Sequence, residues 1–231
     1  MTDIAKMNRE CSGCSLCCKL LPMHDSPEKR QEIVATIKLM IEHGMATLHD
    51  FRGMMPDFEK PAGESCPHQC AKGCRVYAAR PFGCRMWSCR WLTGDDTADL
   101  RRPDRSRYVI DLVPDFIEIE DNDTGEKTPV EVVQIWCDPK HRDAWRDPDL
   151  LAYIERRGRE GKAALIRFSG TDGMAVFPPS LCGDEQWHIH DRGKVLPERA
   201  PHERFDGIAR AQHVKLDLGA DGPTHQEQSK C

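Results

Sequence analysis

The chain has 231 residues, 39% of them hydrophobic and 31% charged, with a formal net charge of −5. Such a length can bury a core in one large domain or two small ones, so the 12 cysteines are not needed as disulfide staples. The acidic balance argues against a general nucleic-acid-binding function.

The apolar residues also argue against a membrane or exported protein. No run approaches the roughly 18 to 20 apolar residues of a membrane helix, and the opening MTDIAKMNREC lacks the apolar core of a secretory signal. We therefore expect a cytoplasmic protein. In that reducing compartment, clustered cysteines bind metal more often than they form disulfides.

The cysteines are concentrated at the start of the chain. The segment CSGCSLCC places four thiols within eight positions, and nine of the 12 cysteines lie in the first 89 residues. The N-terminal part is therefore expected to carry the chemistry. Three isolated cysteines are not expected to be ligands: Cys137, Cys182 and Cys231.

A helix is predicted directly after the first cysteines. Asp25 or Ser26 can cap its start, Pro27 suits its first turn, and Glu28 favours the positive end of the helix dipole. Apolar residues then recur at helical spacing and predict a face that packs in the core: Ile33, Val34, Ile37, Met40 and Ile41.

The second cysteine group, CPHQCAKGCRVYAARPFGCRMWSC, shows few regular signals beyond a short helix from Arg75 to Ala79 that ends before Pro81. Irregular backbone is normal where a metal fixes the conformation.

From about residue 107 the pattern becomes that of strands. RYVIDLV, FIEIE and PVEVVQIW alternate, DNDTG reads as a turn, a helix is predicted from Asp147-Pro148 to Gly158 or Gly161, and AALIRF with MAVF predicts a hairpin. The fold class is therefore α+β: an irregular cysteine-rich N-terminal part with one helix, followed by an antiparallel sheet with a packed helix. We expect a metal-binding domain over residues 1–106, the sheet and helix over 107–190, and a mobile polar tail over 191–231.

Four thiolates form the preferred shell of structural zinc and of iron–sulfur clusters. Cys11, Cys14 and Cys17 have the spacing that holds a [4Fe-4S] cluster in bacterial ferredoxins, where proline follows the fourth ligand, as in Cys66-Pro67. The spacing thus favours a [4Fe-4S]-type cluster over zinc.

Cys17 and Cys18 are adjacent, and neighbouring side chains point in different directions. We therefore expect the two thiols to bind two different metal centres, or one thiol to bind a metal and the other to lie next to the ligands of that metal. Without Cys70, the N-terminal part holds eight cysteines, enough for two four-cysteine sites. We hypothesise two metal centres joined through this pair.

Basic residues accompany the second group. Nine basic and four acidic residues lie between Cys66 and Arg107, and a four-thiolate site carries about −2 net charge. Arg80 and Arg85 are candidates to donate hydrogen bonds to the bound group, although ordinary surface roles are equally compatible with the sequence. His68, set among the cysteines, is a weaker candidate ligand.

These residues resemble a known family. Cys11-x-x-Cys14-x-x-Cys17-Cys18, Cys66-Pro67, Cys74-x-x-Tyr77-x-x-Arg80-Pro81-x-x-Cys84-Arg85 and Cys89 are similar to the CxxCxxCC cysteine-cluster family, also called the YkgJ-type or putative zinc- or iron-chelating domain. The resemblance covers roughly residues 8 to 92, and Cys70 lies outside the pattern. It implies metal chelation by eight residues: Cys11, Cys14, Cys17, Cys18, Cys66, Cys74, Cys84 and Cys89.

The sequence thus favours a metal-binding protein with a structural or electron-transfer centre. One alternative is a protein-modifying enzyme, because a related module occurs in flagellin lysine N-methylases, although this chain has no G-x-G-x-x-G fingerprint and its strand-rich half suggests no catalytic residue. Another is a module that binds a protein partner and is stabilised by metal.

Overall fold

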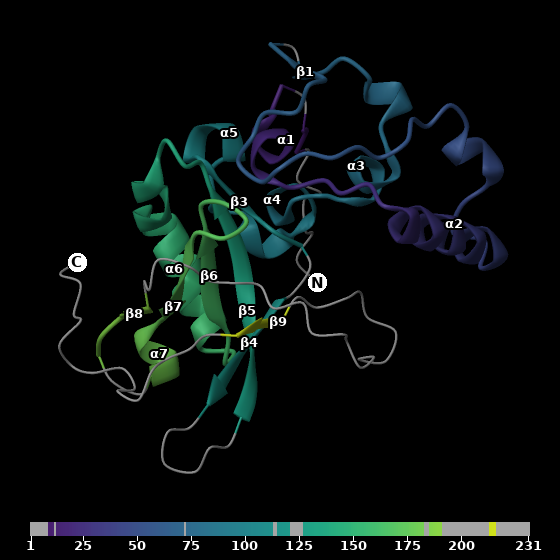
Figure 1. Cartoon of the computed structure of the whole chain (residues 1–231). Coiled ribbons are helices and arrows are strands. Elements are labelled where there is room, and N and C mark those ends of the chain that lie inside the picture. The colour runs from purple at the N-terminus through teal and green to yellow at the C-terminus, as the bar shows by residue number, and fades with distance from the viewer. Residues whose placement is uncertain are drawn as a thin grey trace, which may run out of the picture.

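The computed structural model describes residues 9–190 and 213–215, apart from 12, 72, 113–114, 121–126 and 183–184. Figure 1 shows a cysteine-rich part at one end of a twisted sheet, with a long helix extending to one side. The predicted turn at 121–125 lies outside the described residues. So does the predicted tail, except His213–Lys215, which form a strand.

Strands of the second half form a mixed sheet in the order β8-β7-β6-β5-β4-β9, with β3 also paired to β5. Their bounds are β3 (Tyr108–Ile110), β4 (Asp115–Glu120), β5 (Lys127–Cys137), β6 (Ala163–Arg167), β7 (Gly173–Phe177), β8 (His188–His190) and β9 (His213–Lys215). The predicted α+β class is confirmed. The sheet differs from the prediction because β5 and β6 run parallel, as do β4 and β9.

Helix α6 (Pro148–Gly158) explains the parallel pair. Parallel neighbours need a crossover, and the chain leaves β5, forms the 3-10 turn η4 (Arg142–Arg146) and α6, and returns as β6. The predicted start is confirmed, since the Asp147 side chain caps the helix by accepting the Asp149 N–H. One face of α6 is buried against the sheet through Leu150, Tyr153 and Ile154. The short helix α7 (Pro179–Cys182) follows β7.

The cysteine-rich part consists of one longer helix, α2, and several short helices and strands, consistent with its irregular sequence. They are α1 (Leu16–Leu20), α2 (Pro27–Glu42), η1 (Leu48–Phe51), β1 (Gln69–Cys70), β2 (Gly73–Cys74), η2 (Tyr77–Ala79), α3 (Phe82–Met86), α4 (Arg90–Thr93), η3 (Asp95–Thr97) and α5 (Pro103–Ser106). This part packs on the sheet, because Leu16 and Leu20 of α1 share a buried cluster with Val109 of β3 and Trp136 of β5.

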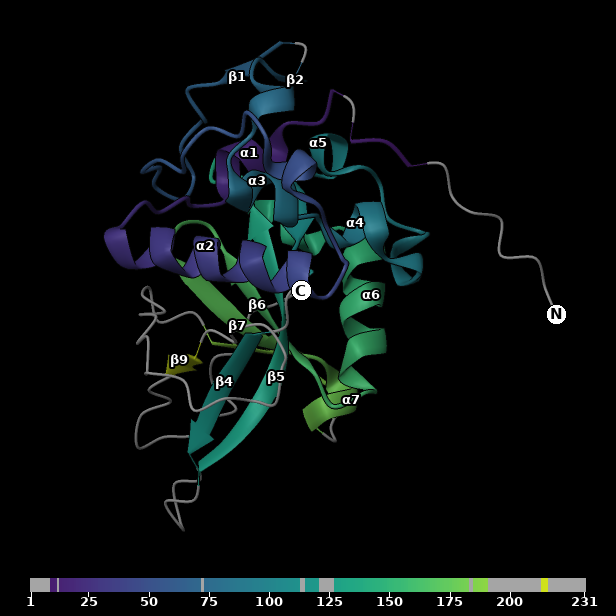
Figure 2. The ribbon, with the colours of Figure 1, turned by 90° about the vertical axis from the view of Figure 1, so that its right-hand side faces the viewer.

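Helix α2 starts as predicted but packs differently. Ser26 caps it by accepting the Lys29 N–H, yet none of its residues is buried, and Val34 is 51% exposed. The predicted core face is therefore wrong. These apolar residues do share one face of the helix, but no described helix or strand packs extensively against it (Figure 2). No described helix has the length and apolarity needed to cross a membrane.

Candidate metal centre

The fold gathers the N-terminal cysteines into two neighbouring groups. The first thiol group lines one small cavity, together with the apolar side chains of Trp91, Leu92, Pro103 and Val109, and consists of Cys11, Cys14, Cys17 and Cys89. The second thiol group consists of Cys84 and the three cysteines that act electrostatically on it, Cys18, Cys66 and Cys74. All of these cysteines are free thiols.

A tight turn shapes the start of the first group. Gly13 adopts a left-handed backbone with φ of 75°, which glycine tolerates best, and the Cys14 N–H donates to the Cys11 carbonyl at 2.9 Å. The Cys14 sulfur accepts backbone N–H groups from Leu16 and Asp104. Such donors favour the thiolate, although burial still raises the pKa of Cys14.

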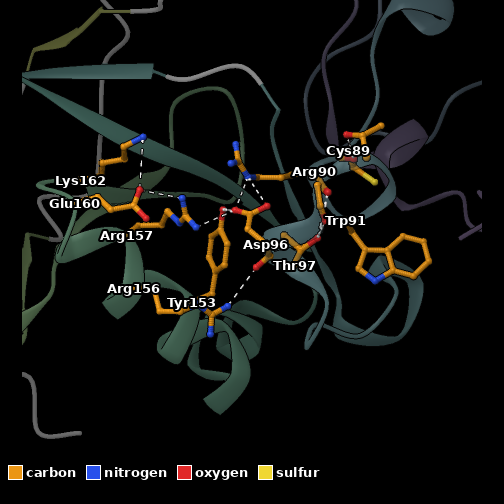
Figure 3. Close-up of polar contacts among 12 residues, drawn as sticks. Cys89, Arg90, Trp91, Asp96, Thr97, Tyr153, Arg156, Arg157, Glu160 and Lys162 are labelled. Carbon is orange, nitrogen blue, oxygen red and sulfur yellow. Dashed lines mark hydrogen bonds and ion pairs between the residues drawn. The ribbon is translucent and has the colours of Figure 1, made fainter. Parts of the chain in front are cut away.

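Cys89 enters the same cavity from the start of α4. Burial raises the pKa of Cys89 to about 11, and the Leu92 N–H, which donates to the Cys89 carbonyl at 2.9 Å, opposes that shift. The next residue, Arg90, anchors α4 by donating to the Asp96 carboxylate at 3.0 Å (Figure 3). Asp96 also pairs with Arg157 at 3.1 Å and accepts the Tyr153 hydroxyl at 3.3 Å, both from α6. Helix α6 therefore holds α4 in place, and with it the side of the cavity that carries Cys89.

The second group joins three separate segments of chain. The Cys66 N–H donates to the Cys18 carbonyl at 3.2 Å, which brings the loop after residue 60 against α1. Burial raises the pKa of Cys84 to about 12, and the nearby thiols of Cys18 and Cys66 and the buried carboxylate of Asp57 add to that effect. At neutral pH the unliganded Cys84 is consequently a neutral thiol.

Cys17 and Cys18 mark the boundary between the groups. The Cys17 thiol donates a hydrogen bond to the Cys18 sulfur, which, with burial, raises the pKa of Cys17 well above its usual value. The same hydrogen bond lowers the pKa of Cys18 to about 7, with help from Lys60 and Arg80. Cys17 is affected by Cys11 and Cys14 of the first group, whereas Cys18 acts on Cys84 of the second group and also on Cys11 of the first.

The eight free cysteines are side chains of the kind that binds a thiophilic metal. Backbone N–H groups favour the thiolate form of two of them, Cys14 and Cys89. Among the described residues, however, no three Cys, His, Asp or Glu side chains already converge so as to hold an ion. Loading therefore requires the sulfurs to turn toward a common point, which rotation about the cysteine Cα–Cβ bond can provide.

Residues 10–103 match the sequence model of a family described as "CxxCxxCC: Putative zinc- or iron-chelating domain". This segment is similar to the CxxCxxCC family. The match contains all eight cysteines of the two thiol groups and ends inside α5, before the sheet begins. Comparisons with curated proteins and with solved structures give no significant match.

Within the matched segment, the cysteine that joins Cys11, Cys14 and Cys17 differs from the sequence-based expectation. The ferredoxin-like spacing pointed to Cys66-Pro67 as the fourth ligand, but the residue in the cavity with Cys11, Cys14 and Cys17 is Cys89. Cys66 lies instead near Cys18 and Cys84. Spacing along the chain cannot distinguish these arrangements, because long irregular loops separate the segments.

The two candidate arginines occupy different positions. Arg80 stacks on the Tyr77 ring at 3.8 Å, and its charge lowers the pKa of Cys18. Arg85 donates to the backbone carbonyls of Arg80, Asp50 and Ala78 at 2.9, 2.6 and 2.6 Å. The guanidinium of Arg85 thus holds the loop together, whereas that of Arg80 acts on a thiol.

The remaining candidates lie apart from these groupings. Cys70 belongs to the two-residue strand β1, paired with Gly73, and the His68 ring packs edge-on against Phe58 at 5.3 Å. Cys137 is buried in the core beside α6, where desolvation raises its pKa to about 12, and Cys182 is the last residue of α7. Cys231 lies outside the described residues.

Sequence reasoning did not identify Lys60, which the structure buries beside the second group. It is 5% exposed and lowers the pKa of Cys18. The only signal in the sequence is its place six residues before Cys66, and a lysine in a loop is normally solvent-exposed.

Proposed function

We propose that the matched segment binds two metal ions, zinc or iron, one in each thiol group, and that these ions hold the segment together. The observation that carries this proposal is the division of eight cysteines into two groups of four, with the adjacent pair Cys17 and Cys18 at the boundary. A four-cysteine shell is complete for a structural ion.

Single ions are favoured over the [4Fe-4S] cluster suggested by the spacing. The cavity that the first group lines is small and is otherwise walled by Trp91, Leu92, Pro103 and Val109. Moreover, Cys66, the ligand on which the ferredoxin comparison depended, lies with the other group. The general affinity order also places zinc above ferrous iron for a thiolate site.

A structural role for the ions is supported by the small amount of regular secondary structure and helix burial in this region. Its helices and strands, apart from α2, have five or fewer residues, and α2 buries none of its side chains. Ions in the two groups would cross-link the segments at 11–18, 66–74 and 84–89. Binding free energy would then also be folding free energy.

Metal analysis of anaerobically purified protein tests the proposal. We expect two ions of zinc or iron per chain and no acid-labile sulfide. Four iron atoms with sulfide and brown colour would contradict the single-ion proposal, and one ion per chain would contradict two centres. Unchanged melting temperature after chelation would contradict the structural role.

A further inference from the structure

Lys60 is a buried cation whose hydrogen bonds are complete. Its side-chain ammonium donates to three backbone carbonyls, those of Lys19, Pro61 and Glu64, at 3.2, 3.1 and 2.9 Å. These acceptors account for all three of its N–H donors. Hydrogen bonding alone, however, does not explain why a charged group stands here.

The three carbonyls come from the segments that carry ligands of the second thiol group. Lys19 directly follows Cys18, and residues 61–64 are separated from Cys66 only by Ser65. The Lys60 backbone also exchanges two hydrogen bonds with Met23, at 2.8 and 2.9 Å, just beyond α1. Both the backbone and the side chain of Lys60 therefore hold the loop against the helix that bears Cys18.

The positive charge of Lys60 forms no close ion pair with a carboxylate of the described residues, and the Glu64 carboxylate acts on it from a longer distance. Among the described residues, no Asp or Glu oxygen lies within ion-pairing distance of the Lys60 ammonium nitrogen. Burial of such a charge is costly unless an anion compensates it. Burial lowers the pKa of Lys60, and the groups that oppose this most strongly are Cys66 and Cys18.

The first thiol group is different. Two cations act on Cys11, namely Arg80 and Arg102. Arg80 stacks on the Tyr77 ring, whereas the Arg102 side chain is 30% exposed and already forms two hydrogen bonds of 2.7 Å with Asp104. Much of the Arg102 charge is therefore compensated and screened by water. Of the two thiol groups, the second is therefore the one with a buried positive charge that no close carboxylate compensates.

We propose that Lys60 is the buried counter-cation of the second thiol group and tightens metal binding by Cys18, Cys66, Cys74 and Cys84. This inference rests on the proposed function. Four thiolates around a divalent ion carry a net charge of about −2. A positive charge fixed nearby in a medium of low dielectric constant stabilises that product far more than an exposed one does.

Lys60→Gln and Lys60→Arg separate charge from hydrogen bonding. Glutamine keeps N–H donors for the carbonyls but removes the charge, whereas arginine keeps both. Lys38→Gln, on the exposed face of α2, is the matched control for loss of one lysine charge. Each full-length protein is loaded with Zn²⁺, and the release of its two ions is titrated with a chromophoric chelator. Cys84→Ser identifies which release step belongs to the second group.

In Lys60→Gln we expect the second-group ion to leave at a chelator concentration about tenfold or more lower, with the first-group ion unchanged. Lys60→Arg should stay within about threefold of the parent, and Lys38→Gln should match it. Unchanged release in Lys60→Gln would overturn the inference. Equal weakening of both ions, or weakening in Lys60→Arg as large as in Lys60→Gln, would overturn it as well, because either result assigns Lys60 a purely structural role. A parent protein that binds neither Zn²⁺ nor Fe²⁺ would instead reject the proposed function itself.

Discussion

Lys19 and Asp138 form an ion pair of 2.6 Å between the helix that carries the adjacent cysteines and the residue that follows β5. The Asp138 side chain is only 5% exposed, and it also accepts the Lys140 N–H at 3.0 Å. Burial alone would raise the pKa of Asp138, but the Lys19 ammonium and the Lys140 N–H together hold it below its usual value. The thiol segment is thereby fastened to the sheet.

Removal of the Lys19–Asp138 ion pair should weaken the attachment of α1 to the sheet. Lys19→Met leaves Asp138 buried without its cation and should lower the free energy of unfolding by about 3 kcal/mol. Because the folded-state pKa of Asp138 is depressed, the contribution is complete above the usual value of 3.8 and is lost as pH falls below it. Urea unfolding at pH 7 and at pH 3 measures both effects. Lys38→Met is the control, and an equal loss at the two pH values would contradict the assignment.

The two thiol groups should respond separately to single substitutions. Cys14→Ser and Cys84→Ser should each lower the metal content from two ions to one, because each removes a ligand from a different group. Cys137→Ser, in the core beside α6, should retain both ions. Mass spectrometry of the native protein counts ions in each variant. Loss of both ions from Cys84→Ser alone would show that the groups do not load independently.

Metal-free protein should lose stability in alkali. Burial raises the pKa of Cys84 to about 12 and that of Cys89 to about 11, whereas an unfolded cysteine ionises near 9.0. A raised folded-state pKa contributes stability that is complete below pH 9 and is lost as pH rises toward 11 or 12. Denaturant unfolding of the chelated, reduced protein between pH 8 and 11 tests the sign. Cys84→Ala should show a shallower decline, and a rise with pH would refute the prediction.

A buried polar chain links the domain to the sheet and ends in Arg167 and Asp115, whose nearest charged atoms are 3.6 Å apart. It runs from the Trp87 indole through Asp111 and Gln134 to Arg167, with hydrogen bonds of 3.1, 3.1 and 2.7 Å.

Asp115→Asn should reduce the free energy of unfolding by about 3 to 5 kcal/mol, because it leaves the Arg167 charge buried and unpaired. Adding Arg167→Met should recover part of the loss. A double variant less stable than the single one, in thermal or urea unfolding, would contradict this account.

The sequence predicted what local rules determine. Ser26 and Asp147 cap their helices as expected, and alternating residues mark the strands, because both signals depend on a few neighbouring positions. The parallel pairing of β5 and β6 was missed because strand patterns carry no direction. The apolar residues of α2 predicted a buried face, but none of the residues of this helix is buried in the folded protein.

The candidate site was predicted as a set of residues but not as a geometry. The motif predicts its eight cysteines as ligands, and the hypothesis of two centres comes from the adjacency of Cys17 and Cys18; both stay predictions. The placement of Cys89 with the first three, and of Lys60 beside the others, depends on contacts across loops of dozens of residues. Such contacts leave no periodic trace in the sequence.

The packing of Cys89 and α1 against Val109 and Trp136 has a consequence for biosynthesis. Translation proceeds from the N-terminus, so all eight thiols emerge from the ribosome before β3 and β5, which close the first cavity from behind. At a typical rate of about 5 to 20 residues per second, the thiols remain outside a finished fold for several seconds. During that interval the nascent chain is open both to metal capture and to oxidation, and the sheet then encloses whichever state the cysteines have reached.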